Sequence, residues 1–180
     1  IKNAAKNGAR LYVMDPRGQS LDRYAAGSLN FKPGSDVALL NGMINTIISE
    51  GLYDEDYVKT HTEGFEDLKA RTAATTPEAM SPICGIDADV IRNTASDFAT
   101  ASASIIFWGM GVSQHTHGTD NARCLISLAL LTGNVGKPGS GLHPLRGQNN
   151  VQGASDAGLI PMFYPDYKAV GGDDIASKYE

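Results

Sequence analysis

One stretch of the sequence concentrates polar side chains and follows neither the helical nor the strand period. It runs from Leu142 to Ala154 and contains one charged side chain, Arg146. The other side chains that form directional hydrogen bonds are His143, Gln148, Asn149, Asn150 and Gln152. A guanidinium binds a carboxylate through two parallel hydrogen bonds, so this stretch is suited to holding a small planar anion. The alternative is a polar loop whose amide side chains satisfy its own backbone.

A second group of candidate residues follows a short apolar run that ends at Met14. Asp15 could accept hydrogen bonds from ribose hydroxyls, and Arg17 could pair with a phosphate. The alternative for these two residues is a solvated turn with a local ion pair. Further along, Pro33 to Asp36 precedes a helix whose N-terminus could hold a phosphate, although Ser35 could equally be an ordinary cap.

A third group follows the apolar run that ends at Trp108. The segment from Gly109 to Gln114 contains a Gly-x-Gly pair, which permits close backbone approach and could hold an anionic group. It lacks the third glycine of the dinucleotide fingerprint, so it does not by itself indicate NAD. His115 and His117 follow, but they have no third ligand at metal-binding spacing, which favours exposed or cofactor-contacting histidines.

These groups need elements that position them, and strands alternate with helices along the chain. Apolar runs predict strands at 9–14, 28–31 and 104–108, the last covered on both faces because it is apolar throughout. Helical periodicity and caps predict helices at 36–50, 53–60, 64–73, 76–83, 87–98 and 119–132. This alternation predicts an α/β fold, layered, with a mainly parallel sheet flanked by helices. In such a sheet, ligands bind at the carboxyl ends of the strands, where the second and third groups lie.

Composition narrows the possible functions. The chain has 180 residues and a net charge of −5, so no basic field favours nucleic acid or an anionic membrane. None of its apolar runs approaches the roughly 20 residues that span a bilayer. Cys84 and Cys124 lie 40 positions apart in the sequence without ligand spacing, so we expect buried free thiols and no metal site of the chain's own. Ile1 to Gly8 is similar to the end of a helix, so we expect the chain to begin inside a larger protein.

Several segments together resemble one family. They are Asp15–Arg17, Lys32–Leu40, Trp108–Gln114, Leu130–Asn134 and Leu145–Ala154. In this order they resemble the catalytic subunit of molybdenum or tungsten formate dehydrogenases, which are bis-molybdopterin guanine dinucleotide oxidoreductases. The resemblance runs from about Ala4 to Tyr167, and the stretch RGQNNVQGA is its most specific part.

The resemblance implies roles for individual residues. It implies that Arg146 orients the formate carboxylate beside the metal. It places Met110, Gly111, Gln114 and Gln148 along the pterin. It places Asp15, Arg17, Gly34 and Asp36 in the pocket of one guanine dinucleotide arm, with Asp36 pairing with the guanine edge.

The resemblance also implies a whole enzyme of which this chain is a central piece. Formate would be oxidised to carbon dioxide, and the electrons would pass through iron–sulfur clusters to an acceptor such as NAD. The partner subunits would be electron-transfer subunits that carry iron–sulfur clusters and NAD or flavin. The resemblance implies that the metal ligand, a cysteine or selenocysteine that histidine follows, and the [4Fe-4S] cysteines lie upstream of this chain. Histidine follows neither Cys84 nor Cys124, so neither is given the role of metal ligand. Residues 1–148 would form a dinucleotide-binding-like domain that holds the cofactor, and residues 149–180 would lead into a neighbouring domain. The motif sequences are most similar to those of the soluble, cytoplasmic, NAD-linked formate dehydrogenases. We expect the fragment alone to be inactive.

Two other classes stay open on the residues alone. One is another bis-pterin oxidoreductase, such as a nitrate reductase. The other is a non-catalytic nucleotide-binding module on the same fold, because a fold does not fix the chemistry it carries.

Overall fold

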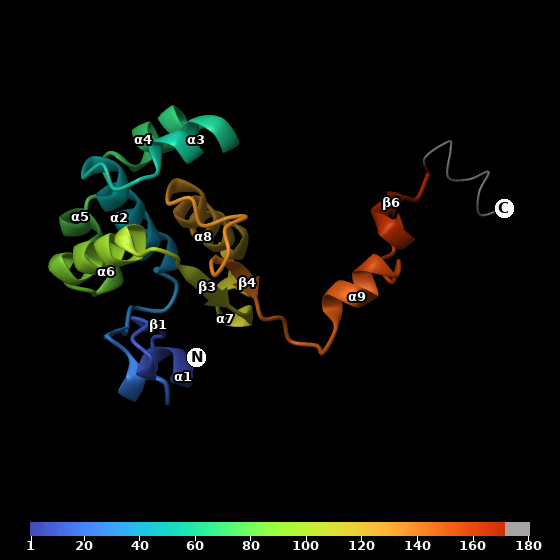
Figure 1. Ribbon diagram of the computed structural model, residues 1–180, viewed down its shortest axis with the longest axis horizontal. Coiled ribbons are helices and arrows are strands. Elements are labelled where there is room, and N and C mark those ends of the chain that lie inside the picture. The colour runs from blue at the N-terminus through green and yellow to red at the C-terminus, as the bar shows by residue number, and fades with distance from the viewer. Residues whose placement is uncertain (172–180) are drawn as a thin grey trace. The chain divides into compact units, whose positions relative to one another are not determined.

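The computed structural model describes residues 1–171 of the chain, which divide into two compact units (Figure 1). The first unit comprises residues Ile1–His143, and the second begins at Pro144. Residues 172–180, which the predicted second segment includes, lie outside the described residues.

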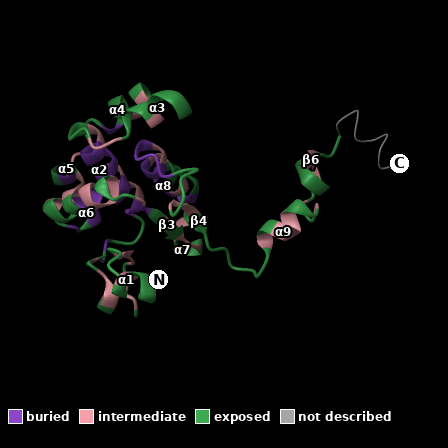
Figure 2. Ribbon diagram, in the orientation of Figure 1, coloured by how far each residue is buried: buried purple, intermediate pink, exposed green. Residues whose placement is uncertain are grey.

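The core of the first unit is built around helix α2 (Asp36–Ser49). This helix packs against α5 (Pro77–Cys84), α6 (Ala88–Thr100) and α8 (Gly118–Leu131). Its residues are buried almost continuously from Leu39 to Ile47, and Figure 2 shows buried residues concentrated in α2 and α8. A helix buried on nearly all sides belongs at the centre of a domain. The prediction of a helix at 36–50 is therefore confirmed, with a wider buried surface than one face.

Three of the predicted helix starts are confirmed by their caps. Asp54 accepts a hydrogen bond from the Tyr57 amide at the start of α3 (Glu55–His61). Thr76 accepts one from Ala79 at the start of α5, and Asp87 accepts one from Asp89 at the start of α6. Helix α4 (Phe65–Thr72) begins after Gly64, which has a left-handed backbone conformation. These starts were predictable because a cap is a local interaction between residues two or three positions apart.

The expectation that Ser35 caps helix α2 through its side chain is wrong. The Ser35 hydroxyl donates a 2.6 Å hydrogen bond backwards to the Lys32 carbonyl, and no helix amide donates to it. The hydroxyl closes the turn that precedes the helix instead, which is the competing local use of a serine side chain.

The strands confirm the mixed α/β class. Strand β1 (Tyr12–Met14) pairs in parallel with β2 (Gly27–Leu29), with Met14 opposite Leu29. Strand β3 (Ile105–Trp108) pairs with β4 (Gly141–Pro144), which was not predicted. Among the described residues each sheet has two strands.

Strand β3 is covered on one face, whereas its sequence predicted cover on both. Ile106 and Trp108 pack against the core, but Ile105 and Phe107 are 43% and 47% exposed. The exposed Phe107 ring stacks on His143 of β4, with centroids 5.2 Å apart. Alternate side chains of a strand point to opposite faces, so an apolar run cannot reveal whether a second layer covers its outer face.

A cluster of three side chains joins β1 to α6. Arg10 donates a hydrogen bond to the Asp97 carboxylate, and so does the Tyr12 hydroxyl. Burial, followed by the Asp97 carboxylate, raises the pKa of Tyr12, so the phenol keeps the proton that it donates. This cluster fixes strand β1, which leads directly to Asp15.

The second unit has little interior of its own. It contains helix α9 (Val151–Asp156) and the antiparallel pair β5 (Phe163–Tyr164) and β6 (Lys168–Ala169), and none of its described residues is buried. The remaining short elements of the chain are α1 (Lys2–Lys6), η1 (Asp22–Tyr24), α7 (Met110–Ser113) and η2 (Pro165–Tyr167). No helix formed by residues 1–171 is long and apolar enough to cross a membrane.

Candidate functional site

The candidate residues Asp15 and Arg17 follow strand β1, at the carboxyl end of the parallel pair β1–β2. Asp15 follows β1 and Asn30 follows β2, and the Asn30 side-chain amide donates a 2.7 Å hydrogen bond to the Asp15 carbonyl. Because the strands are parallel, the chain leaving β2 towards helix α2 starts at the same edge as Asp15. The structure thus brings Asp15 and Arg17 to the same sheet edge as the loop that carries Gly34 and Asp36.

Hydrogen bonds within its own turn engage the Asp15 carboxylate. It accepts from the Arg17 backbone amide at 2.8 Å and from the Gln19 side-chain amide at 2.7 Å. These two donors, the Arg17 amide foremost, lower the pKa of Asp15 and keep it ionised. The Arg17 guanidinium stays 3.8 Å from this carboxylate, and its side chain is 82% exposed. The local ion pair that was the alternative is present, and Arg17 can still reach an anion.

Sequence reasoning did not single out Asp22, which lies beside this turn. One of its carboxylate oxygens accepts a hydrogen bond from the Gln19 amide. The other oxygen, Oδ1, is buried without a hydrogen-bond partner among residues 1–171. No sequence signal indicates this, because burial of one oxygen depends on how the turn folds.

The candidate residues Gly34 and Asp36 lie at the N-terminus of the 14-residue helix α2. Asp36 is 6% exposed, and its carboxylate has no hydrogen-bond or ion-pair partner among the described residues. Gly34 has a φ of 81°, and a side chain there would meet no atom within 4 Å. The residue is almost buried, but its carboxylate oxygens still reach the surface, because Asp22 Oδ1 is the only fully buried side-chain oxygen without a partner within residues 1–171. A carboxylate without a partner, beside an open glycine at a helix N-terminus, suits a ligand with hydrogen-bond donors and an anionic group. The helix dipole alone also stabilises Asp36, by about 0.3–1 kcal/mol.

The loop before α2 is held from the other side by α5. The Lys32 amide donates to the Cys84 carbonyl at 2.8 Å, and the Lys32 ammonium donates to the Pro82 carbonyl at 2.9 Å. An ammonium is favoured at a helix C-terminus, where carbonyls lack partners. This contact fixes the approach of the loop to Asp36.

Most of the segment from Gly109 to Gln114 forms a single helical turn, α7. Met110 is 47% exposed, and its sulfur accepts a hydrogen bond from the Gln114 side-chain amide at 3.3 Å. A side chain at Gly109 or Gly111 would meet no atom within 4 Å. The backbone of this turn is therefore open to a large ligand, as the two glycines suggested.

The remaining predicted residues, Arg146 and Gln148, lie exposed in the second unit. Arg146 has a φ of 61°, which is uncommon for a residue other than glycine, and makes no hydrogen bond or ion pair within residues 1–171. Such backbone strain concentrates at ligand sites. Asn150 accepts a hydrogen bond from the Gly153 amide and caps α9. For Asn150 the alternative therefore holds, in which an amide side chain of the polar stretch bonds to the backbone of that stretch.

The polar stretch is more regular than its sequence indicated. Strand β4 reaches Pro144 and α9 begins at Val151. The irregular part therefore narrows to the residues around Arg146. Short elements of four to six residues carry too few periodic positions to be detected from sequence.

The histidines and cysteines of the chain form no metal centre in the described part. No three His, Cys, Asp or Glu side chains within residues 1–171 lie together as metal ligands. His117 is 3.8 Å from Asp120 on exposed surface. Cys84 and Cys124 are free and buried, as predicted. Burial, with a smaller contribution from Asp120, raises the pKa of Cys124 to about 11.

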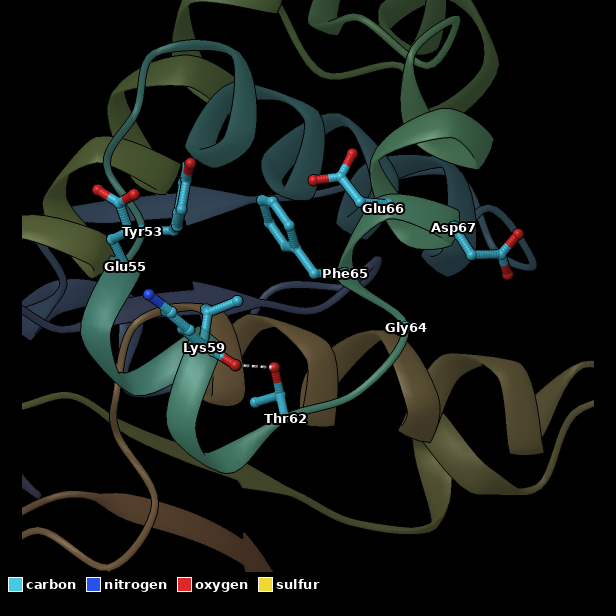
Figure 3. Close-up of a pocket in the computed structure, with 9 residues that line it drawn as sticks. Tyr53, Glu55, Lys59, Thr62, Gly64, Phe65, Glu66 and Asp67 are labelled. Carbon is cyan, nitrogen blue, oxygen red and sulfur yellow. Dashed lines mark hydrogen bonds between the residues drawn. The ribbon is translucent and has the colours of Figure 1, made fainter.

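An open hollow of about 470 Å³ lies between α3 and α4 (Figure 3). Its floor includes Tyr53 and Phe65, whose ring centroids are 4.9 Å apart. No predicted site residue lines this hollow, so it is separate from the candidate residues of the first unit.

Taken together, the first unit is an α/β domain with an open glycine turn, a helix N-terminus carrying a free carboxylate, and an exposed guanidinium. These features suit a ligand that has both hydrogen-bond donors and an anionic group. The model of the molybdopterin oxidoreductase family matches residues 1–178. The chain belongs to this family.

Curated relatives of the chain include formate dehydrogenases. Formate dehydrogenase H of Escherichia coli is 48% identical over 170 residues, which are 94% of this chain and 24% of that protein. The F420-dependent formate dehydrogenase subunit alpha of Methanocaldococcus jannaschii is 46% identical over 94% of this chain and 25% of its own length. The chain thus spans about a quarter of the length of these relatives. The resemblance inferred from the motifs is confirmed.

A solved structure supports the fold. The acetylene hydratase of Pelobacter acetylenicus aligns with a TM-score of 0.72 and 36% identity, covering 76% of this chain and 19% of that one.

Proposed function

We propose that the chain is part of the catalytic subunit of a formate dehydrogenase, which oxidises formate to carbon dioxide at a pterin-bound molybdenum or tungsten. The observation that carries this proposal is the identity of 48% and 46% with two formate dehydrogenases over 94% of the chain. The oxidoreductase family that matches residues 1–178 supports the same reaction class.

The first unit would hold the guanine dinucleotide form of the cofactor. Asp36 would accept hydrogen bonds from the guanine edge, because the residue is almost buried and its carboxylate has no partner among the described residues. Arg17 would pair with a phosphate, and Asp15 would order the turn that presents it. Gly34 leaves room beside the helix N-terminus for the backbone to approach the nucleotide.

The remaining candidate residues lie in turn α7 of the first unit and in the second unit. Met110, Gly111, Gln114 and Gln148 would line the pterin. Arg146 would bind the formate carboxylate through its fork and stabilise negative charge during the reaction. The metal–pterin group supplies the two-electron redox chemistry when it is bound, and the residues of this chain position formate for it.

The rest of the enzyme would lie outside this chain. We propose that residues 1–148 form the cofactor-binding domain and that residues 149–180 lead into the next one. The metal ligand and the [4Fe-4S] cluster would belong to the parent subunit. Partner subunits would pass the electrons to an acceptor such as NAD, in the cytoplasm.

A second candidate is another bis-pterin oxidoreductase. An assimilatory nitrate reductase of Bacillus subtilis is 34% identical over 97% of this chain, and a nitrate reductase of Synechocystis is 36% identical over 89%. These identities are lower than the 48% and 46% with the two formate dehydrogenases, which supports formate over nitrate as the proposed substrate. Assays of the full-length protein with formate and with nitrate separate the two candidates.

The role of Arg146 can be tested in the full-length protein with the variants Arg146→Ala and Arg146→Lys. We expect Arg146→Ala to lower formate turnover by about 10²–10³-fold, with normal pterin content, because one charged donor at the reacting group is lost. Arg146→Lys keeps the positive charge but cannot bind the carboxylate through two parallel hydrogen bonds. Its turnover should therefore lie between those of Arg146→Ala and the unaltered protein. Arg123→Ala is a matched control, because Arg123 is an exposed arginine of α8 that only pairs with Asp120. Normal turnover in Arg146→Ala would remove Arg146 from the site.

A further inference from the structure

We propose that Asn121 is a positioning residue for the pterin, which acts by holding the turn α7 in place from helix α8. The proposal rests on the function proposed above, because it takes Met110 and Gln114 of α7 as residues that line the pterin. Nothing in the sequence pattern singled out Asn121, which reads as one polar residue in an amphipathic helix.

Asn121 is a buried polar residue with a specific bond to the turn. It is 2% exposed, and its side-chain amide donates a 2.8 Å hydrogen bond to the Val112 carbonyl. A buried amide is costly unless it is hydrogen-bonded, so this bond fixes the distance between α8 and the middle of α7.

Val112 holds the turn against the core, whereas residues on either side of it are exposed. The Val112 side chain packs against the core of the first unit. Met110 and Gln114, two residues to either side, are exposed. A single helical turn is only marginally stable by itself, because it fixes several backbone angles for one hydrogen bond. The Val112 side chain and the Asn121 bond therefore determine where Met110 and Gln114 lie.

Gly118 lets the two elements approach closely enough for this bond. A Cβ atom at Gly118 would lie 1.9 Å from the Ser113 carbonyl oxygen, so no side chain fits there without moving α7 or the start of α8. Gly118 is buried at the first position of α8, three residues before Asn121. A glycine for close approach and an asparagine for the hydrogen bond thus join α7 to α8 at two points.

The experiment uses the full-length protein loaded with its metal and pterin, with the variant Asn121→Leu. This variant keeps the approximate size of the side chain and removes the donor. The matched control is Asn45→Leu, because Asn45 is 8% exposed and donates the same kind of bond, 2.9 Å long, to the Thr72 carbonyl at the end of α4. Both variants lose a side-chain amide that donates to a backbone carbonyl, and Asn45→Leu also loses a longer bond of 3.5 Å to the Ala73 carbonyl. Only Asn121→Leu releases α7.

Three quantities are measured: the melting temperature, the rate at which pterin is lost after dilution, and the paramagnetic resonance spectrum of the metal. We expect similar drops in melting temperature for the two variants. We expect Asn121→Leu to lose pterin about tenfold faster than Asn45→Leu, in line with the effect of residues that orient a ligand-contacting group. We also expect a broadened metal spectrum in Asn121→Leu alone, because Met110 and Gln114 would adopt several positions.

Gly118→Ala is the second variant, and it should give the same faster pterin loss because it displaces α7 while the Asn121 side chain is kept. It also decides the question if Asn121→Leu does not fold. Equal pterin loss and equal spectra in Asn121→Leu, Gly118→Ala and Asn45→Leu would overturn the positioning role while leaving the proposed function intact. Absence of pterin from the unaltered full-length protein would overturn the proposed function and this role with it.

Discussion

At the scale of single residues, the two carboxylates of the proposed nucleotide site, Asp15 and Asp36, differ in their hydrogen bonding. Two donors of its own turn engage Asp15, whereas Asp36 has no partner among the described residues although it is 6% exposed. A carboxylate that is already satisfied orders the protein, and one that is nearly buried and unsatisfied can bind a ligand. In the proposed site, Asp15 would order the turn and Asp36 would bind the ligand.

This difference predicts how Asp36→Asn and Asp15→Asn behave in the full-length protein. Asp36→Asn should retain the guanine dinucleotide cofactor about tenfold less well, because hydrogen bonds to a charged group contribute about 1.5–3 kcal/mol and an amide presents donors to the donors of guanine. Asp15→Asn should weaken retention less. Nucleotide and pterin content after gel filtration measure both, and equal retention in the two variants would contradict the assignment of Asp36.

The buried thiol of Cys124 gives a prediction on pH. Burial raises the pKa of Cys124 to about 11, so the reactive thiolate is scarce near neutral pH and increases as the pH rises. The alkylation rate of Cys124 by iodoacetamide should keep rising about tenfold per pH unit up to pH ~9.5, whereas an ordinary thiol levels off near its pKa of about 8.5. Mass spectrometry of the Cys124 peptide follows the rate. A plateau below pH 9 would show that the thiol is not buried as described.

At the scale of elements, the helices meet at tight junctions that depend on glycine. Gly133 follows α8 with a φ of 62°, and a Cβ atom there would lie 2.7 Å from the Asp54 carboxylate, which caps α3. The Asp54 amide also donates to the Leu131 carbonyl at 2.8 Å. The end of α8 and the start of α3 therefore form one joint.

Gly133→Ala should destabilise this joint more than Gly51→Ala does. Both glycines have a left-handed backbone, with a φ of 66° at Gly51, so each substitution costs about 1–2 kcal/mol of unfolding free energy. No atom lies within 4 Å of a Cβ at Gly51, whereas the Gly133 substitution also displaces the Asp54 cap, which costs about 0.5–2 kcal/mol more. Urea denaturation followed by fluorescence of Trp108, the single tryptophan, measures the difference. Equal losses would mean that Asp54 moves freely.

The elements also show what the sequence could predict and what it could not. Helix starts at Asp54, Thr76 and Asp87 were predictable because their caps are local. The exposed face of β3 was not, because exposure of Ile105 and Phe107 depends on whether another layer covers them. At the site, residue types indicated Arg17, Asp36 and the glycine turn. That Asp36 has no partner among the described residues, and that Asn121 bonds to Val112 nine positions away, depends on how the chain folds around these side chains.

At the scale of the whole molecule, the chain divides the proposed work between two units. The first unit has a core and carries the candidate nucleotide and pterin residues up to Gln114. The second carries Arg146 and has no buried residue within its described part. The chain also covers only about a quarter of its formate dehydrogenase relatives. Turnover is therefore a property to be tested in the full-length protein.

The most direct test measures metal, pterin and formate-dependent reduction of an electron acceptor in one sample of the full-length protein. Our account predicts molybdenum or tungsten bound to a guanine dinucleotide pterin, and acceptor reduction that requires formate. Metal and pterin with nitrate-dependent but no formate-dependent turnover would contradict the proposed substrate. A properly matured protein without metal and pterin would contradict the central claim that this domain holds a redox cofactor.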